Sequence, residues 1–201
     1  MRIPDVFVTV ALVASFVPDL AAARSQIQTQ RLMATSVPLE ASSTSSVLAA
    51  VWQDRLIATR EKLATLSDPS ATSSRPVSNV SVDAFAASFT DGDKTIILSA
   101  LYTMPDCRNL SGAAAPSLNN CPIRIAVLEN GRVKVVASVN DFPFVAALKN
   151  LGNDQGNEFD NKSKRDKTLV TFDPATHEIT TVLTLNGVRD TEKSTPIRIS
   201  Y

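Results

Sequence analysis

Apolar residues follow two different spacings along the chain. Over residues 45–66, Leu48, Trp52, Leu56 and Leu63 recur at helical spacing, with charged residues on the opposite side. Ser45 or Ser46 can cap the start, and Ser67-Asp68-Pro69 ends the pattern. This segment is therefore predicted to be one amphipathic helix packed on the core, followed by a linker at 67–79.

A hairpin over Cys121–Val139 is predicted to form the centre of the fold. Asn130-Gly131 favours a type I′ turn, because both central residues of that turn need positive φ. A two-residue loop sets the register: it places Leu128 opposite Val133, and Ile125 opposite Val136. Both faces of this ribbon are largely apolar, so a layer is expected to pack on each face.

Further strands are predicted on either side of this hairpin. Asp91-Gly92 is interpreted as a turn that pairs Phe89 with Lys94 and gathers several aromatic and aliphatic side chains on one face. A Thr-rich hairpin is expected from 168–172 and 179–185, with an edge strand at 196–201. Between the central hairpin and this Thr-rich hairpin, residues 142–150 are predicted to form a short helix and residues 152–167 a long polar loop.

Together these patterns predict an α+β fold. One N-terminal amphipathic helix would pack on a mainly antiparallel β meander of about six to seven strands, and the alternative is an all-β sandwich.

The first residues resemble a secretory signal peptide. Residues 6–17 carry no charge, and Ala21-x-Ala23 suits cleavage, so 1–23 is predicted to be removed. The apolar run is shorter than the roughly 20 residues needed to span a bilayer, which argues against stable membrane insertion. Residues 24–44 are interpreted as a flexible polar lead, and 45–201 as a single domain. The expected location is secreted or periplasmic.

Charge and cysteine content narrow the function further. Twenty basic and twenty acidic residues give a formal net charge of +0, which disfavours nucleic-acid binding. Cys107 and Cys121 suit a disulfide in an exported protein. The ring that they close is a candidate recognition loop, and its alternative is a stapled surface loop without a partner. The candidate contact residues in this loop are Arg108, Asn109, Leu110, Leu118 and Asn119.

Other candidate chemistry is sparse. Asp154, Glu158 and Asp160 offer oxygen ligands for calcium, but the EF-hand spacing fails and a solvated loop has the same composition. His177 is the single histidine and is expected to be a turn residue, although a Ser-His-Asp arrangement can form from distant residues. No metal site, cofactor or catalytic residue is assigned.

The sequence therefore favours an exported, non-enzymatic binding protein whose partner is another protein or an extracellular ligand. The alternatives are a small secreted hydrolase whose site forms only in three dimensions, and a carrier of a small apolar ligand between helix and sheet.

Overall fold

The computed structural model describes residues 26–42, 46–66, 80–103, 106–110, 117–146, 167–185, 188–189 and 196–201. The predicted signal peptide at 1–23 and the predicted linker at 67–79 lie outside these residues. The predicted calcium loop lies outside them as well.

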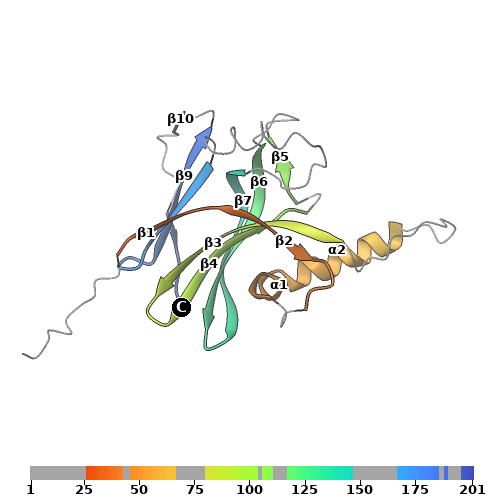
Figure 1. Ribbon diagram of the computed structural model, residues 1–201, viewed down its shortest axis with the longest axis horizontal. Coiled ribbons are helices and arrows are strands. Elements are labelled where there is room, and N and C mark those ends of the chain that lie inside the picture. The colour runs from red at the N-terminus through yellow and green to blue at the C-terminus, as the bar shows by residue number, and fades with distance from the viewer. Residues whose placement is uncertain are drawn as a thin grey trace, which may run out of the picture.

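Most of the described chain is β-structure, arranged in two antiparallel sheets (Figure 1). One sheet has the order β1-β8-β9-β10, with β11 also paired to β9. The other has the order β2-β3-β4-β6-β5, with β7 on the second edge of β6. The strands are β1 (Gln28–Arg31), β2 (Met33–Pro38), β3 (Ser81–Asp91), β4 (Lys94–Leu101), β5 (Arg108–Asn109), β6 (Ser117–Glu129), β7 (Arg132–Ala146), β8 (Lys167–Asp173), β9 (Glu178–Leu185), β10 (Val188–Arg189) and β11 (Ile197–Arg198).

The segment predicted to be a flexible lead contains two strands, so that prediction is wrong for its described part. β1 pairs with β8 and β2 pairs with β3, with only Leu32 between them. The Leu32 N–H donates to the Thr168 carbonyl at 2.9 Å, and its side chain is buried. The Ser, Thr and Gln content of this segment favoured the prediction of a flexible segment. Pairing with distant strands instead provides hydrogen-bond partners for its backbone N–H and C=O groups. The segment joins one sheet to the other.

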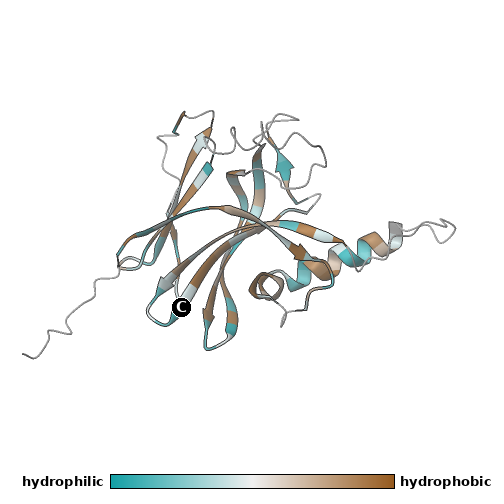
Figure 2. Cartoon of the chain, viewed as in Figure 1, coloured by the Kyte–Doolittle hydropathy of each residue, from teal (hydrophilic) through white to brown (hydrophobic). Residues whose placement is uncertain are grey.

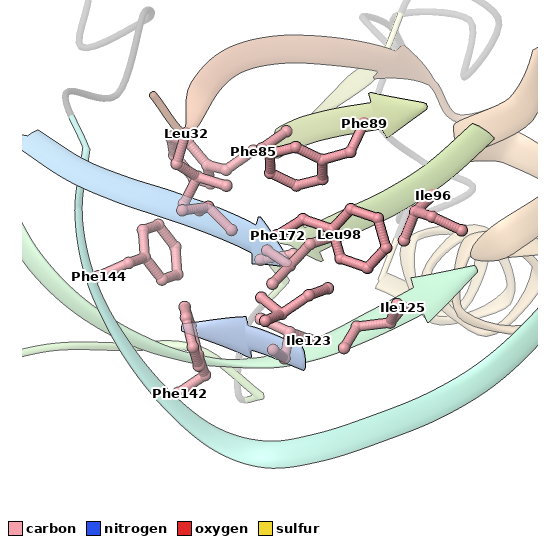
Figure 3. Packing of buried hydrophobic residues seen from close by; sticks show 14 of the residues in the cluster. Leu32, Phe85, Phe89, Ile96, Leu98, Ile123, Ile125, Phe142, Phe144 and Phe172 are labelled. Atoms are coloured by element: carbon pink, nitrogen blue, oxygen red, sulfur yellow. The ribbon is translucent and has the colours of Figure 1, made fainter. Parts of the chain in front are cut away.

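The main hydrophobic core lies between the two sheets (Figure 3). Phe85 packs against Phe144 with ring centroids 4.9 Å apart, and Phe89 packs against Phe172 at 5.8 Å. Phe172 comes from the β8 sheet and the other three rings from the β6 sheet, so the Phe89–Phe172 contact joins the two sheets, whereas the Phe85–Phe144 contact lies within the β6 sheet. Leu98, Ile123 and Ile125 fill the same core and are fully buried.

Two helices pack against part of the outer face of the β6 sheet, and α2 extends beyond it (Figure 1). They are α1 (Val47–Val51) and α2 (Gln53–Leu66), and Trp52 separates them. The Ser46 hydroxyl caps α1 by accepting from the Ala49 N–H at 3.0 Å. Val51, Trp52 and Leu56 then bury against Ala84 and Ala126 of the sheet. Figure 2 shows apolar and polar stretches alternating along α2, as the helical spacing predicts.

The prediction of one N-terminal helix on a single meander is therefore wrong in two respects. The helical segment is broken at Trp52, and it follows two strands instead of opening the domain. The break has a physical cause, because Arg124 donates to the Val51 carbonyl at 2.7 Å while the Trp52 indole donates to Ser99 Oγ at 3.0 Å. The mostly β, two-sheet architecture agrees in part with the sandwich alternative.

The central hairpin forms where predicted, and layers pack on both faces. Asn130 and Gly131 have φ of 49° and 73°, as a type I′ turn requires. The register is as predicted from Glu129 opposite Arg132 as far as Ala126 opposite Val135. The predicted pairing of Ile125 with Val136 is wrong, because a β-bulge places Ala137 opposite Ile125.

The other hairpins follow the predictions in part. In the β3–β4 hairpin, Asp91 lies opposite Lys94 and Phe89 opposite Ile96, so the predicted turn at Asp91-Gly92 is displaced by one residue. Gly92 has φ of 60° and takes the first turn position. The resulting two-residue register shift leaves each side chain on its predicted face. The β8–β9 hairpin and the strand at 197–198 are confirmed.

The sequence also predicted a short helix at 142–150 and no stable membrane insertion. The helix predicted to start at Phe142 is wrong over its described part, because β7 continues as strand to Ala146. Phe142 and Phe144 instead point into the inter-sheet core at strand spacing. Across the described residues, the helices are too short or too polar to span a bilayer.

Candidate functional site: the disulfide-closed loop

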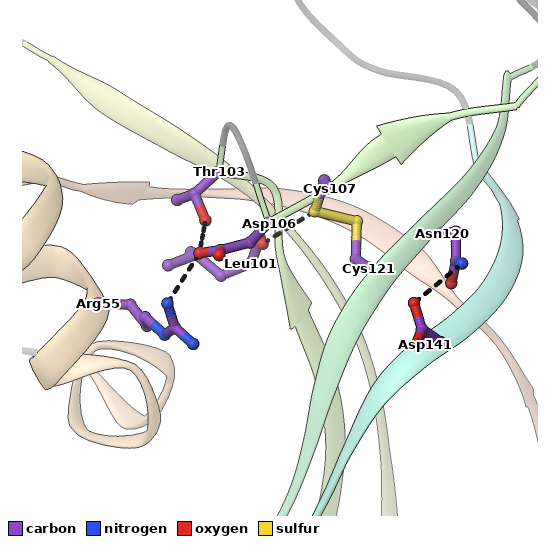
Figure 4. The surroundings of a disulfide bond; sticks show 8 residues. All are labelled: Arg55, Leu101, Thr103, Asp106, Cys107, Asn120, Cys121 and Asp141. Carbon is purple, nitrogen blue, oxygen red and sulfur yellow. Dashed lines mark hydrogen bonds and ion pairs between the residues drawn. A yellow bond between two sulfur atoms is a disulfide. The ribbon is translucent and has the colours of Figure 1, made fainter.

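The two cysteines form the predicted disulfide beside the start of β6 (Figure 4). Their Cα atoms are 4.3 Å apart, and both residues are buried in the inter-sheet core. Cys121 lies in β6, and Cys107 lies after β4 and directly before β5. The covalent link therefore fixes both ends of the intervening loop to the core of the domain.

Polar contacts hold the base of this loop against α2. The Cys107 N–H donates to the Thr103 carbonyl at 2.8 Å. Asp106 Oδ2 accepts from the Thr103 hydroxyl at 3.2 Å and from Arg55 at 2.9 Å. The Arg55–Asp106 pair is partly exposed, so it contributes little to stability. It holds the residue that directly precedes Cys107 against α2 (Figure 4).

A short antiparallel stem continues outward from the disulfide. Arg108 pairs with Asn120 and Asn109 pairs with Asn119, so β5 extends the ladder on β6. The Leu110 N–H then donates to the Leu118 carbonyl at 2.7 Å. These contacts restrict the backbone at both ends of the loop before any ligand binds. Such restriction lowers the entropy cost of binding.

The predicted contact residues divide by exposure. Arg108, Asn109 and Leu110 are exposed, and Leu110 has 55% of its surface accessible. Leu118 is half-buried, whereas Asn119 is fully buried and cannot present its side chain to a partner. Alternation along β6 accounts for this difference, because successive side chains point to opposite faces. Residues 111–116 of the loop lie outside the described chain.

The predicted calcium ligands Asp154, Glu158 and Asp160 also lie outside the described residues. Within the described ranges, His, Cys, Asp and Glu side chains form no group of three or more with metal-binding geometry.

His177 occupies a turn, as the sequence predicts, with φ of 53°. Its Nε2 lies 3.6 Å from Asp91 Oδ2, and its ring stacks on Tyr201 with centroids 4.9 Å apart. The Tyr201 hydroxyl donates to the same carboxylate, and burial together with this contact raises the pKa of Tyr201. Sequence reasoning missed Asp91 and Tyr201, because three segments far apart in the chain meet here.

The described residues line two hollows that open on the surface. The helix-side hollow, of about 470 Å³, lies between α2 and the start of β3, and its walls include Thr59, Leu63, Val82 and Asp83. Burial raises the pKa of the Asp83 carboxyl. The turn-side hollow, of about 660 Å³, lies beside the Asn130-Gly131 turn at the other end of β6 from the disulfide. Neither hollow was visible in the sequence.

Comparison with known protein families, curated proteins and solved structures finds no match to this chain. The candidate sites therefore rest on the geometry of the chain itself.

Proposed function

We propose that this protein is an exported, non-enzymatic binding protein that contacts its partner through the disulfide-closed loop. The observation that carries the proposal is the contrast between the fixed base of that loop and the exposed residues next to it. Its base is held by a buried disulfide and a β stem, while Leu110 extends an apolar side chain into solvent beside Arg108. An exposed apolar residue on a pre-organised backbone suits recognition of another protein.

The disulfide also supports an extracellular or periplasmic location. Structural disulfides persist in oxidising compartments and are rare in reducing ones. The expected signal peptide leads to the same location. Intact mass measured on protein recovered from the exported fraction should correspond to a chain that begins at Arg24. A chain that retains residues 1–23 would contradict this part of the proposal.

The recognition role is tested by immobilising the chain and capturing partners from the extracellular medium of the producing cells. Leu110→Ser should lower recovery of a specific partner by about tenfold, because it removes the exposed apolar contact. Leu185→Ser is the matched control, since Leu185 is also exposed (36%) but lies on β9 in the other sheet. Equal recovery by both variants would move the contact away from the loop.

A further inference from the structure

The turn-side hollow is lined by both charged and apolar residues. Its lining includes Val127, Glu129, Arg132, Lys134 and Tyr201. Val127 belongs to the inter-sheet core, and its cross-strand partner is Lys134. Cross-strand partners lie on one face of a sheet, so Lys134 lies on the same core-facing side as Val127. Arg132 is two residues away in the same strand and therefore shares that face.

Glu129 near this hollow has a cationic partner, and two of the cations form no ion pair with a described residue. Lys94 lies 3.5 Å from Glu129, and Asp91 accepts from the Tyr201 hydroxyl. In contrast, Arg132 and Lys134 form no ion pair with any described residue, and both are exposed. Together with Glu129 and its partner Lys94, the hollow therefore has an excess of positive charge, and two of the cations come from one strand.

The remaining walls include Glu129 and Asn130 and an apolar part formed by Val127 and the Tyr201 ring, whose position is fixed. Tyr201 is held by the stacked ring of His177 and by the Asp91 carboxylate, and Lys94 lies 5.4 Å from its ring centroid. Val127 adds aliphatic surface on the core-facing side, whereas the Val133 side chain alternates to the other face and packs on the helix side. A space of about 660 Å³ is within the range of small-molecule sites, which combine apolar walls with a few charged groups.

We propose that the turn-side hollow binds a small organic anion, with Arg132 and Lys134 pairing to its charged group and Val127 and the Tyr201 ring contacting its apolar body. This site is separate from the recognition loop, because the hollow and the disulfide lie at opposite ends of β6. The competing explanation is that the two cations only discourage edge-to-edge pairing of β7, a common role of charge on an edge strand.

Calorimetric titration of the full chain with 2-naphthoate and with its neutral counterpart 2-naphthalenemethanol separates the two explanations. Naphthoate should bind about tenfold more tightly than the alcohol, because only the anion can pair with the two cations. Rising NaCl concentration should weaken the binding of naphthoate and leave that of the alcohol unchanged.

Arg132→Gln with Lys134→Gln should remove the preference for the anion. The control is Arg60→Gln with Arg189→Gln, which removes the same charge from α2 and β10 and should change naphthoate affinity less than about twofold. Circular dichroism verifies that each variant is folded. The proposal is overturned if wild type shows no salt-sensitive preference for naphthoate, or if both double variants lose affinity equally.

Discussion

Arg124 joins the helical layer to the β6 sheet through several contacts. Its guanidinium contacts Asp54 through two bonds of 2.6 and 2.7 Å and donates to the Val51 carbonyl at 2.7 Å. It also lies 4.5 Å from the centroid of the Trp52 ring. One side chain thus satisfies the carbonyl freed where α1 ends and joins the helix break to the sheet.

Replacing Arg124 should therefore destabilise the domain although its main partner is exposed. Arg124→Leu should lower the free energy of unfolding by about 2 kcal/mol, because a partly buried carbonyl loses its donor and the Trp52 ring loses its neighbour. Urea denaturation measures the change. Arg198→Leu is the control, because Arg198 also pairs with a carboxylate but is 74% exposed, and it should cost less than about 0.5 kcal/mol.

Lowering the pH should weaken the contact between Arg124 and Asp54 by protonating the Asp54 carboxylate. The hydrogen bond and charge of Arg124 lower the pKa of Asp54 below its ordinary value of 3.8. A lowered carboxyl pKa gives stability that is present above 3.8 and is lost as pH falls toward the folded-state value. The difference in urea midpoint between wild type and Asp54→Asn should therefore shrink between about pH 6 and about pH 3. A constant difference would show that the ion pair adds no stability.

At the scale of single elements, the sequence predicted what local chemistry determines. The Asn130-Gly131 turn is local, because its positive φ values depend on the two residues themselves. The bulge opposite Ile125 was not predicted, since it depends on how the ribbon fits between the helices and the other sheet. The break at Trp52 was missed for the same reason, because Arg124 and Ser99 come from other strands.

The central turn gives a direct prediction at this scale. Gly131→Val should lower the free energy of unfolding by more than about 1 kcal/mol, because a β-branched residue is strained at a φ of 73°. No neighbouring atom lies within 4 Å of the added Cβ position, so the cost comes from the backbone and not from a clash. Lys134→Ala in the adjacent strand should cost far less. Equal urea midpoints for the two variants would show that the turn is not strained.

At the scale of the whole molecule, long-range pairing determines what the sequence could not show. The segment 28–38 alternates poorly, yet it pairs with β8 in one sheet and β3 in the other. The candidate site divides in the same way. Two cysteines on either side of a small-residue segment predicted the disulfide loop, whereas the turn-side hollow needs Tyr201 to come within reach of the 130–131 turn.

The disulfide should contribute to the stability of the whole domain, and this effect is not confined to the loop that it closes. Cys107→Ser with Cys121→Ser should lower the thermal midpoint by several degrees, because closing a loop of this size contributes roughly 3 kcal/mol. Differential scanning calorimetry measures the shift. Adding a reductant to wild type should reproduce it, and an unchanged midpoint in both experiments would contradict the structural role of the bond.

The most direct test of the account separates recognition from folding in one variant. Residues 110–116 are replaced by a Gly/Ser segment of equal length, with both cysteines and β5 retained, and thermal midpoint and partner affinity are measured together. The midpoint should stay close to that of wild type, because the disulfide and stem are intact, and the affinity for the captured partner should be at least about tenfold weaker. An unfolded variant, or one that binds its partner with wild-type affinity, would contradict this prediction.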